Sequence, residues 1–100
     1  MTEEKVAGAL GLVRRAGKIT VGSYLVREAL LKGKAALVLF ASDAGLSGEK
    51  KIVSAAERMG VPTRRIGLCK VQLAECVGKK GEAVCVSVPK EFLNLVLASL

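Results

Sequence analysis

The chain has 100 residues, of which 51% are hydrophobic and 3% aromatic, and its formal net charge is +7. This length and apolar content exclude a disordered chain and predict that residues 1–100 form one domain with an aliphatic core. The scarcity of aromatic residues argues against RNA modules that stack bases on paired aromatic side chains. The positive charge favours a polyanionic partner, and nucleic acid is the first candidate.

The first residues, the longest apolar run and the cysteines together predict the cellular location of the protein. The chain starts with the acidic segment MTEE and no apolar run follows it, so we expect no secretory signal. The longest apolar run, residues 35–41, is too short to cross a bilayer. Three cysteines are an odd number for a disulfide framework, so we expect reduced thiols and a cytoplasmic protein.

Apolar periodicity, glycines and prolines divide the chain into alternating helices and strands. The expected elements are a helix at 3–15, a strand at 18–21, a helix that stops at Gly33, a strand at 35–41, a helix of about a dozen residues that Ser47 caps and Gly60 ends, a strand at 63–66, a helix at 71–77, a strand at 83–88 and a helix that opens at Pro89.

Helical spacing also predicts which side chains pack inward. They are Val6, Leu10, Val13, Val26, Ala29, Leu30, Ile52, Ala55, Ala56, Met59, Leu73, Cys76, Val77, Phe92, Leu93, Val96 and Leu97. Helices that alternate with apolar strands pack on both faces of a sheet. The predicted fold is therefore a three-layer α/β/α sandwich with a small central mixed sheet.

The first β–turn–α unit, GKITVGSYLVREALLKG at residues 17–33, carries the first candidate site. Its small-residue turn at Gly22 and Ser23 leads into a helix whose first N–H groups lack partners, and such a helix start attracts phosphates. Lys18 lies just before this helix start and Arg27 just inside it. The alternative is an ordinary surface turn.

Catalysis and metal binding find little support in the sequence. There is no histidine, and Asp43 is the only aspartate, so a general base and a carboxylate pair are both missing. The segment GLSGEKK lacks the spacing of a Walker motif. The cysteines are seven and nine residues apart, without the CxxC spacing of zinc sites. We expect no enzyme activity, cofactor or metal.

Basic residues gather in pairs at the expected element ends. The pairs are Arg14-Arg15, Lys32 with Lys34, Lys50-Lys51, Arg64-Arg65 and Lys79-Lys80. A solvated surface would also place charge there, but several element ends converge on each edge of an α/β sandwich. We expect three of these basic segments to lie together at one edge of the sandwich: the turn between Lys18 and Arg27, the pair Lys50-Lys51 and the loop at 64–70.

Four segments resemble the kink-turn RNA-binding superfamily of ribosomal proteins, and within it the small bacterial YlxQ-like proteins. These segments are LGLVRRAGKITVG, ALLKGKAALVLFASDAG followed by EKK, MGVPTRRI and LAECVGKKGEAVCVSV. The resemblance covers nearly the whole chain. It implies an α/β/α fold that docks on a sharply bent RNA internal loop, with a helix start at the sheared G·A pairs and a second loop over a flipped-out nucleotide.

The resemblance also assigns positions. The helix start corresponds to Gly22, Ser23, Tyr24, Leu25 and Glu28, and the second loop to Gly67, Leu68, Cys69 and Lys70. Archaeal and eukaryotic members carry Asn, Glu and Lys where this chain has Tyr24, Leu25 and Glu28. The side chains that read guanine edges are thus replaced, and Tyr24 becomes a candidate for stacking on an unpaired base.

Together these features predict a monomeric, non-catalytic protein that binds structured RNA, with a kink-turn-like internal loop as ligand and association with the ribosome. The candidate contacts are those of the helix start and second loop, together with Lys18, Arg27, Lys50 and Lys51. The alternative is a protein–protein adaptor that keeps the fold but has lost specific RNA reading. An enzyme or a small-ligand protein is a third class.

Overall fold

The computed structural model describes residues 2–100, apart from the side chains of Thr2, Leu46 and Ser47. In chain order the elements are α1 (Thr2–Arg15), β1 (Thr20–Val21), α2 (Ser23–Leu31), β2 (Leu37–Phe40), α3 (Leu46–Met59), β3 (Thr63–Arg65), α4 (Lys70–Cys76), β4 (Cys85–Val88), the 3₁₀ turn η1 (Lys90–Phe92) and α5 (Leu93–Ser99). Every helix and strand expected from the sequence is present.

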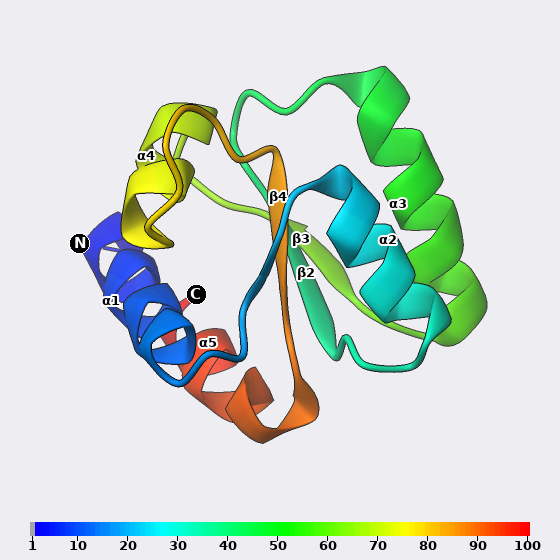
Figure 1. Ribbon diagram of the computed structural model, residues 1–100, viewed down its shortest axis with the longest axis horizontal. Coiled ribbons are helices and arrows are strands. Elements are labelled where there is room, and N and C mark those ends of the chain that lie inside the picture. Colours follow the sequence, from blue (N-terminus) through cyan, green and yellow to red (C-terminus); the bar gives the residue numbers. More distant parts are fainter. Residues whose placement is uncertain (1) are drawn as a thin grey trace.

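The strands form one mixed sheet in the order β1-β4-β2-β3. β4 is antiparallel to both of its neighbours, whereas β2 and β3 are parallel. Figure 1 shows α1, α4 and α5 on one side of this sheet and α2 and α3 on the other. The predicted three-layer α/β/α sandwich with a small mixed sheet is therefore confirmed.

The core lies on both faces of the two central strands, since every residue of β2 and β4 is buried. Most of the predicted inward residues are buried or half-buried, and they come from all five α-helices. Met59 and Leu97 are exposed, so these two predictions are wrong. Met59 is the last residue of α3, next to the left-handed Gly60. In α5 the buried positions are Val96 and Ser99, and this stripe passes beside Leu97.

One helix start differs from the sequence prediction. α3 begins at Leu46, and Gly45 occupies its N-cap position with extended backbone angles. Ser47 therefore lies inside the first turn, and the expectation that it caps the helix is wrong. The side chain of Ser47 is outside the described residues.

The strand register sorts the loops between two ends of the sheet. Val21 pairs with Val86, and Phe40 pairs with both Cys85 and Arg65, so these residues lie at one end. The helices α2, α3 and α4 all start there, in the upper part of Figure 1. The opposite end holds Lys18, the start of β2 and Pro89. Different residues therefore gather at the two ends of the sheet.

Candidate nucleic-acid interface

Four segments meet at the end of the sheet where α2, α3 and α4 start. We call this surface the rim and define it as residues 22–25, 42–45, 67–70 and 78–82. Backbone hydrogen bonds join the segments to one another and to β4. Ser42 N donates to Leu68 O at 2.8 Å, Ala83 N to Lys70 O at 3.0 Å and Gly22 N to Cys85 O at 2.9 Å. The rim is thus part of the folded frame.

The start of α2 is exposed and lacks a side-chain cap within the described chain. Gly22, its N-cap residue, has φ 95°, a left-handed angle that favours glycine over any residue with a Cβ. The side chains of Tyr24 and Leu25 are 74% and 54% exposed. First-turn N–H groups without intrahelical partners attract anions. The predicted helix start is therefore available for a ligand.

Lys79 reaches the same helix start from the loop between α4 and β4. A Cβ built on Gly22 would lie 3.8 Å from Lys79 Nζ. Burial raises the pKa of the neighbouring Cys85 thiol to about 11, while a hydrogen bond from Ser23 and the charge of Lys79 act in the opposite direction. A lysine ammonium and free helix N–H groups thus share one position, which suits a phosphate.

The sequence predicted Lys79 only as one of several basic pairs, not as a site residue. The signal that was missed is topological. The GKKG turn at residues 78–81 leads into β4, and β4 pairs with β1, which leads into α2. Knowing that pairing would have placed Lys79 beside Gly22.

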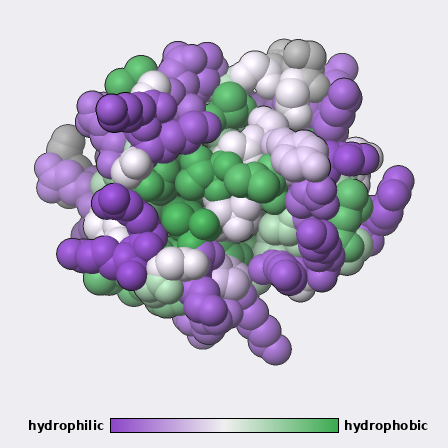
Figure 2. Space-filling view, in the orientation of Figure 1, coloured by the Kyte–Doolittle hydropathy of each residue, from purple (hydrophilic) through white to green (hydrophobic). Residues whose placement is uncertain are grey.

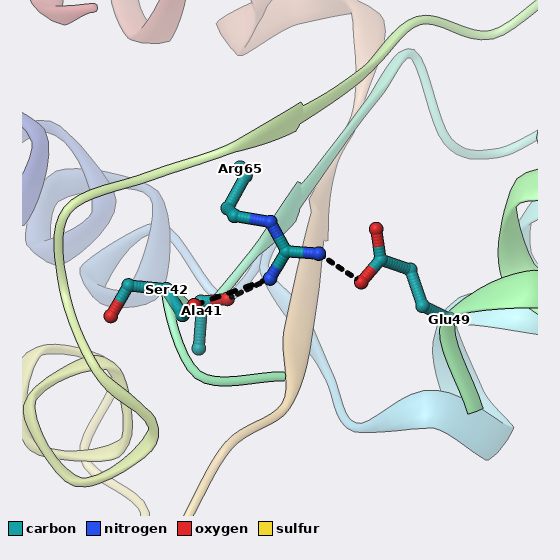
Figure 3. Close-up of polar contacts among 4 residues, drawn as sticks. All are labelled: Ala41, Ser42, Glu49 and Arg65. Carbon is teal, nitrogen blue, oxygen red and sulfur yellow. Dashed lines mark hydrogen bonds and ion pairs between the residues drawn. The ribbon is translucent and has the colours of Figure 1, made fainter. Parts of the chain in front are cut away.

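Arg65 holds the loop between β2 and α3 in place (Figure 3). Its guanidinium donates hydrogen bonds to Ala41 O at 3.1 Å and Ser42 O at 3.3 Å, and it forms an ion pair with Glu49. Arginine presents several donors in a planar fork, which allows one side chain to join strand β3, the loop and α3. Arg65 therefore has a structural role, since it fixes the rim loop that follows β2.

The second predicted contact loop, Gly67–Lys70, is ordered by Asp43. The carboxylate of Asp43 accepts a hydrogen bond from Lys70 N at 2.8 Å, at the start of α4. Cys69 N donates to the Gln72 side chain at 2.9 Å, which completes the helix cap. Gly67 is exposed, whereas Leu68 is buried in the core. Cys69 and Lys70 are half-buried, and Lys70 Nζ lies 3.9 Å from the carboxylate of Glu82. A ligand can therefore reach the backbone and Gly67 fully, and the side chains of Cys69 and Lys70 in part.

The other predicted contacts separate into two places. Arg27, Lys50 and Lys51 line one hollow between α2 and α3, just below the rim, as the sequence suggested. Lys18 does not share the rim and lines a hollow at the opposite end of the sheet with Lys34 and Lys90. That part of the prediction is wrong because β1 runs between Lys18 and Gly22 and carries them to opposite ends.

Glu28 lies on α2 between two partners one turn away on either side. Its carboxylate is 3.9 Å from Lys32 Nζ. Through hydrogen bonding and charge, Glu28 also raises the pKa of the Tyr24 hydroxyl. The ring of Tyr24 itself is exposed to solvent beside the helix start.

An apolar area lies in the centre of the face shown in Figure 2, framed by hydrophilic side chains. A groove between β1 and α2 has an apolar part, formed by Ile19, Val21, Leu25 and Ala29, and a polar part, formed by Thr20, Glu28, Lys32 and Lys34.

Among the described side chains, no group of three or more potential His, Cys, Asp or Glu ligands gathers as a metal site would require. Within residues 2–100 no helix has both the length and the apolarity needed to cross a bilayer.

The fold and the rim together define an α/β/α protein with a backbone-rich surface at one end of a mixed sheet, where Lys70, Lys79 and Lys80 lie with Asp43 and Glu82. The chain belongs to the Ribosomal protein L7Ae/L30e/S12e/Gadd45 family, whose family model matches residues 4–96. The family resemblance seen in the sequence motifs is thereby confirmed.

Relatives agree with this assignment. An RNA-binding protein of Geobacillus thermodenitrificans and RNA-binding protein GK0100 of Geobacillus kaustophilus are each 37% identical over 68 residues, covering 61% of this chain and 83% of theirs. A solved protein with unknown function from Bacillus halodurans superposes with a TM-score of 0.86 at 29% identity, over 95% of both chains. The Giardia lamblia 15.5kD RNA binding protein superposes with a TM-score of 0.78 at 21% identity, over 98% of this chain and 83% of that one, and this likeness shows the fold alone.

Proposed function

We propose that this chain is a non-catalytic protein that binds structured RNA at the rim, with a kink-turn-like internal loop as its ligand. The observation that carries the proposal is the meeting of Lys79 Nζ with the uncapped start of α2 at Gly22. Family membership and the RNA-binding names of the Geobacillus relatives support RNA as the ligand class. We further propose that the protein is monomeric, cytoplasmic and ribosome-associated.

In this mode the helix start and Lys79 receive phosphate oxygens, while Tyr24 stacks on an unpaired base. The loop at Gly67–Lys70 covers a second, flipped-out nucleotide with its backbone. Arg27, Lys50 and Lys51 extend the positive surface below the rim and contact the phosphates of the adjoining stem. The proposed contacts are phosphate contacts, backbone contacts and stacking, so recognition depends on RNA shape.

The test compares two RNAs and three proteins. One RNA carries an internal loop with tandem G·A pairs, and the other replaces these pairs with Watson–Crick pairs. Wild type should prefer the first RNA, and Lys79→Gln should weaken its binding and lower the salt slope by about 1. Lys5→Gln, which removes an exposed charge on α1, is the matched control. Equal binding of both RNAs, with equal effects of the two variants, would overturn the proposal.

A protein–protein adaptor is the second candidate, and the apolar groove along β1 is the observation in its favour. Leu25, which lines this groove, is 54% exposed. Exposed apolar patches often mark protein contacts. An adaptor should retain its partner in a pull-down after nuclease treatment, whereas the RNA-binding function predicts that the captured components are lost with the RNA.

A further inference from the structure

A second basic surface lies at the end of the sheet opposite the rim. Lys18, Lys34 and Lys90 line one hollow there, from three different connections of the chain. Lys18 precedes β1, Lys34 precedes β2 and Lys90 follows β4 in η1. Ala36 N donates to Val88 O at 2.8 Å, which holds two of these connections together. We call this surface the lower hollow.

The charge of the lower hollow is not neutralised by neighbouring carboxylates. All three lysines are exposed, and within residues 2–100 none has a carboxylate oxygen within 4.0 Å. Glu91 is the acidic side chain that also lines the hollow. The helix ends nearby carry basic residues of their own, Arg15 in the last turn of α1 and Lys32 at the C-cap of α2. Because these residues already complement the helix dipoles, the three lysines of the hollow are not required for that role.

Small residues in the lining of the hollow leave room for a bulky ligand. Gly17 and Gly33 have left-handed φ angles of 70° and 72°, and nothing lies within 4 Å of a Cβ built on either of them. Ala35 and Ala36 are small. No aromatic ring lines the hollow in the described chain, so it offers nothing on which a free nucleotide base would stack. These features fit a sugar–phosphate backbone bound through its charge.

We propose that the lower hollow is a second RNA-binding surface, which holds the phosphate backbone of an RNA segment other than the one at the rim. The two surfaces lie at opposite ends of the sheet, in a molecule of 31 × 28 × 21 Å. The protein then bridges two RNA segments. The proposal relies on the proposed function only for the RNA at the rim, because backbone binding at the lower hollow needs no particular sequence.

The probe is a plain, fluorescently labelled RNA duplex without an internal loop. Lys18→Gln, Lys34→Gln and Lys90→Gln are combined in one variant. A control variant combines Lys5→Gln with Arg58→Gln and Arg64→Gln, which removes the same charge from exposed positions outside both surfaces. The thermal unfolding of each variant is compared with wild type, and single Lys34→Gln replaces the triple variant should the latter unfold early.

The lower-hollow variant should bind the duplex more weakly, with a salt slope reduced by about 2–3, since each phosphate that is no longer neutralised lowers the slope by about 0.9. The control variant should lose much less. Protein saturated with unlabelled internal-loop RNA should still bind the labelled duplex, because the two surfaces are separate. Equal losses in both triple variants, no duplex binding by wild type, or complete displacement of the duplex by the internal-loop RNA would each overturn the proposal.

The outcomes for the two surfaces are distinguishable. If the internal-loop RNA shows no preference but the lower-hollow variant alone loses duplex binding, the proposed function fails and the second surface stands. If internal-loop binding depends on Lys79 while duplex binding is unaffected by the lower-hollow variant, the reverse holds.

Discussion

Replacing Arg65 by lysine tests whether one guanidinium fork orders the rim. Lysine keeps the charge and reaches one partner, so Arg65→Lys keeps an attraction to Glu49 but loses the hydrogen bonds to Ala41 O and Ser42 O. Each hydrogen bond contributes about 0.5–1.5 kcal/mol, and partial exposure places both toward the lower end of that range. The exposed ion pair contributes about 0–1 kcal/mol in either variant. We therefore expect a loss of about 1–2 kcal/mol.

The assay is thermal and urea unfolding, with Arg64→Lys as the control. Arg64 is the exposed neighbour on β3, and its side chain makes no hydrogen bond within residues 2–100. For a protein of this size, 1 kcal/mol lowers the melting temperature by roughly 4–8 °C. Arg65→Lys should melt lower by about that amount or somewhat more, while Arg64→Lys should match wild type. Equal melting of the two variants would refute the assigned role.

Hydrogen exchange separates local from general loosening. The amide of Ser42, which donates to Leu68 O, and the amide of Lys70, which donates to Asp43, join the two rim loops. In Arg65→Lys both amides should exchange faster than in wild type under conditions where the amides of β4 are unchanged. Uniformly faster exchange along the chain would instead mean a global loss of stability.

Three further outcomes follow from single residues. Gly78→Ala should lose about 1–2 kcal/mol in urea unfolding, because its φ is 72°, a left-handed angle that is unfavourable for a residue with a Cβ, while the flexible Arg14 side chain nearby can move aside. The helical Gly8→Ala, with free space around the new Cβ, should gain about 0.5–1 kcal/mol. In the folded protein the pKa of the Cys85 thiol is raised to about 11. The stability that the protonated thiol contributes is therefore complete below the pKa of the unfolded chain and is lost as the pH rises toward 11. Between about pH 8 and about pH 10.5, the free energy of unfolding of wild type should fall by about 2 kcal/mol more than that of Cys85→Ala. Tyr24→Ala should weaken binding of the internal-loop RNA by about 1–3 kcal/mol in a titration, while Tyr24→Phe, which keeps the ring, should bind like wild type.

Local pattern was enough to predict the elements and their layers. The periodic stripes of α1 and α3 and the unbroken apolar run of β2 each carry a signal that tertiary structure reinforces. The start of α2 was predicted for the same reason, since a small-residue turn before a helix is a local feature. These parts of the fold and of the candidate site depend on residues close together in sequence.

The positions of Lys18 and Lys79 depend on strand order, which no local pattern specifies. Thr20 pairs with Ser87, and this long-range contact decides that Lys79 meets Gly22 while Lys18 is carried to the other end. The bonds from Arg65 to Ala41 O and from Lys70 N to Asp43 likewise join residues more than twenty positions apart. The sequence therefore predicted that Arg27 lies near Lys50 and Lys51, but not that Lys79 lies beside Gly22 or that Lys18 lies apart from them.

The direction of the helices gives the two ends of the sheet different electrostatics. The rim collects helix N-termini, so backbone N–H groups there attract anions by hydrogen bonding and by the helix dipole. The lower hollow lies beside the C-terminal ends of α1 and α2, and the only helical element that begins there in the described chain is the short turn η1. The three lysines of the hollow therefore provide the main attraction for phosphates. Hydrogen bonds from amides release no counterions, whereas ammonium–phosphate contacts do.

Gly22→Ala, which strains the helix start, should therefore weaken internal-loop binding with little change in salt slope, whereas the Lys79→Gln variant should lower the slope by about 1. Salt titrations of the two variants measure this contrast directly, and a slope that changes equally in both would mean that charge alone drives binding at the rim.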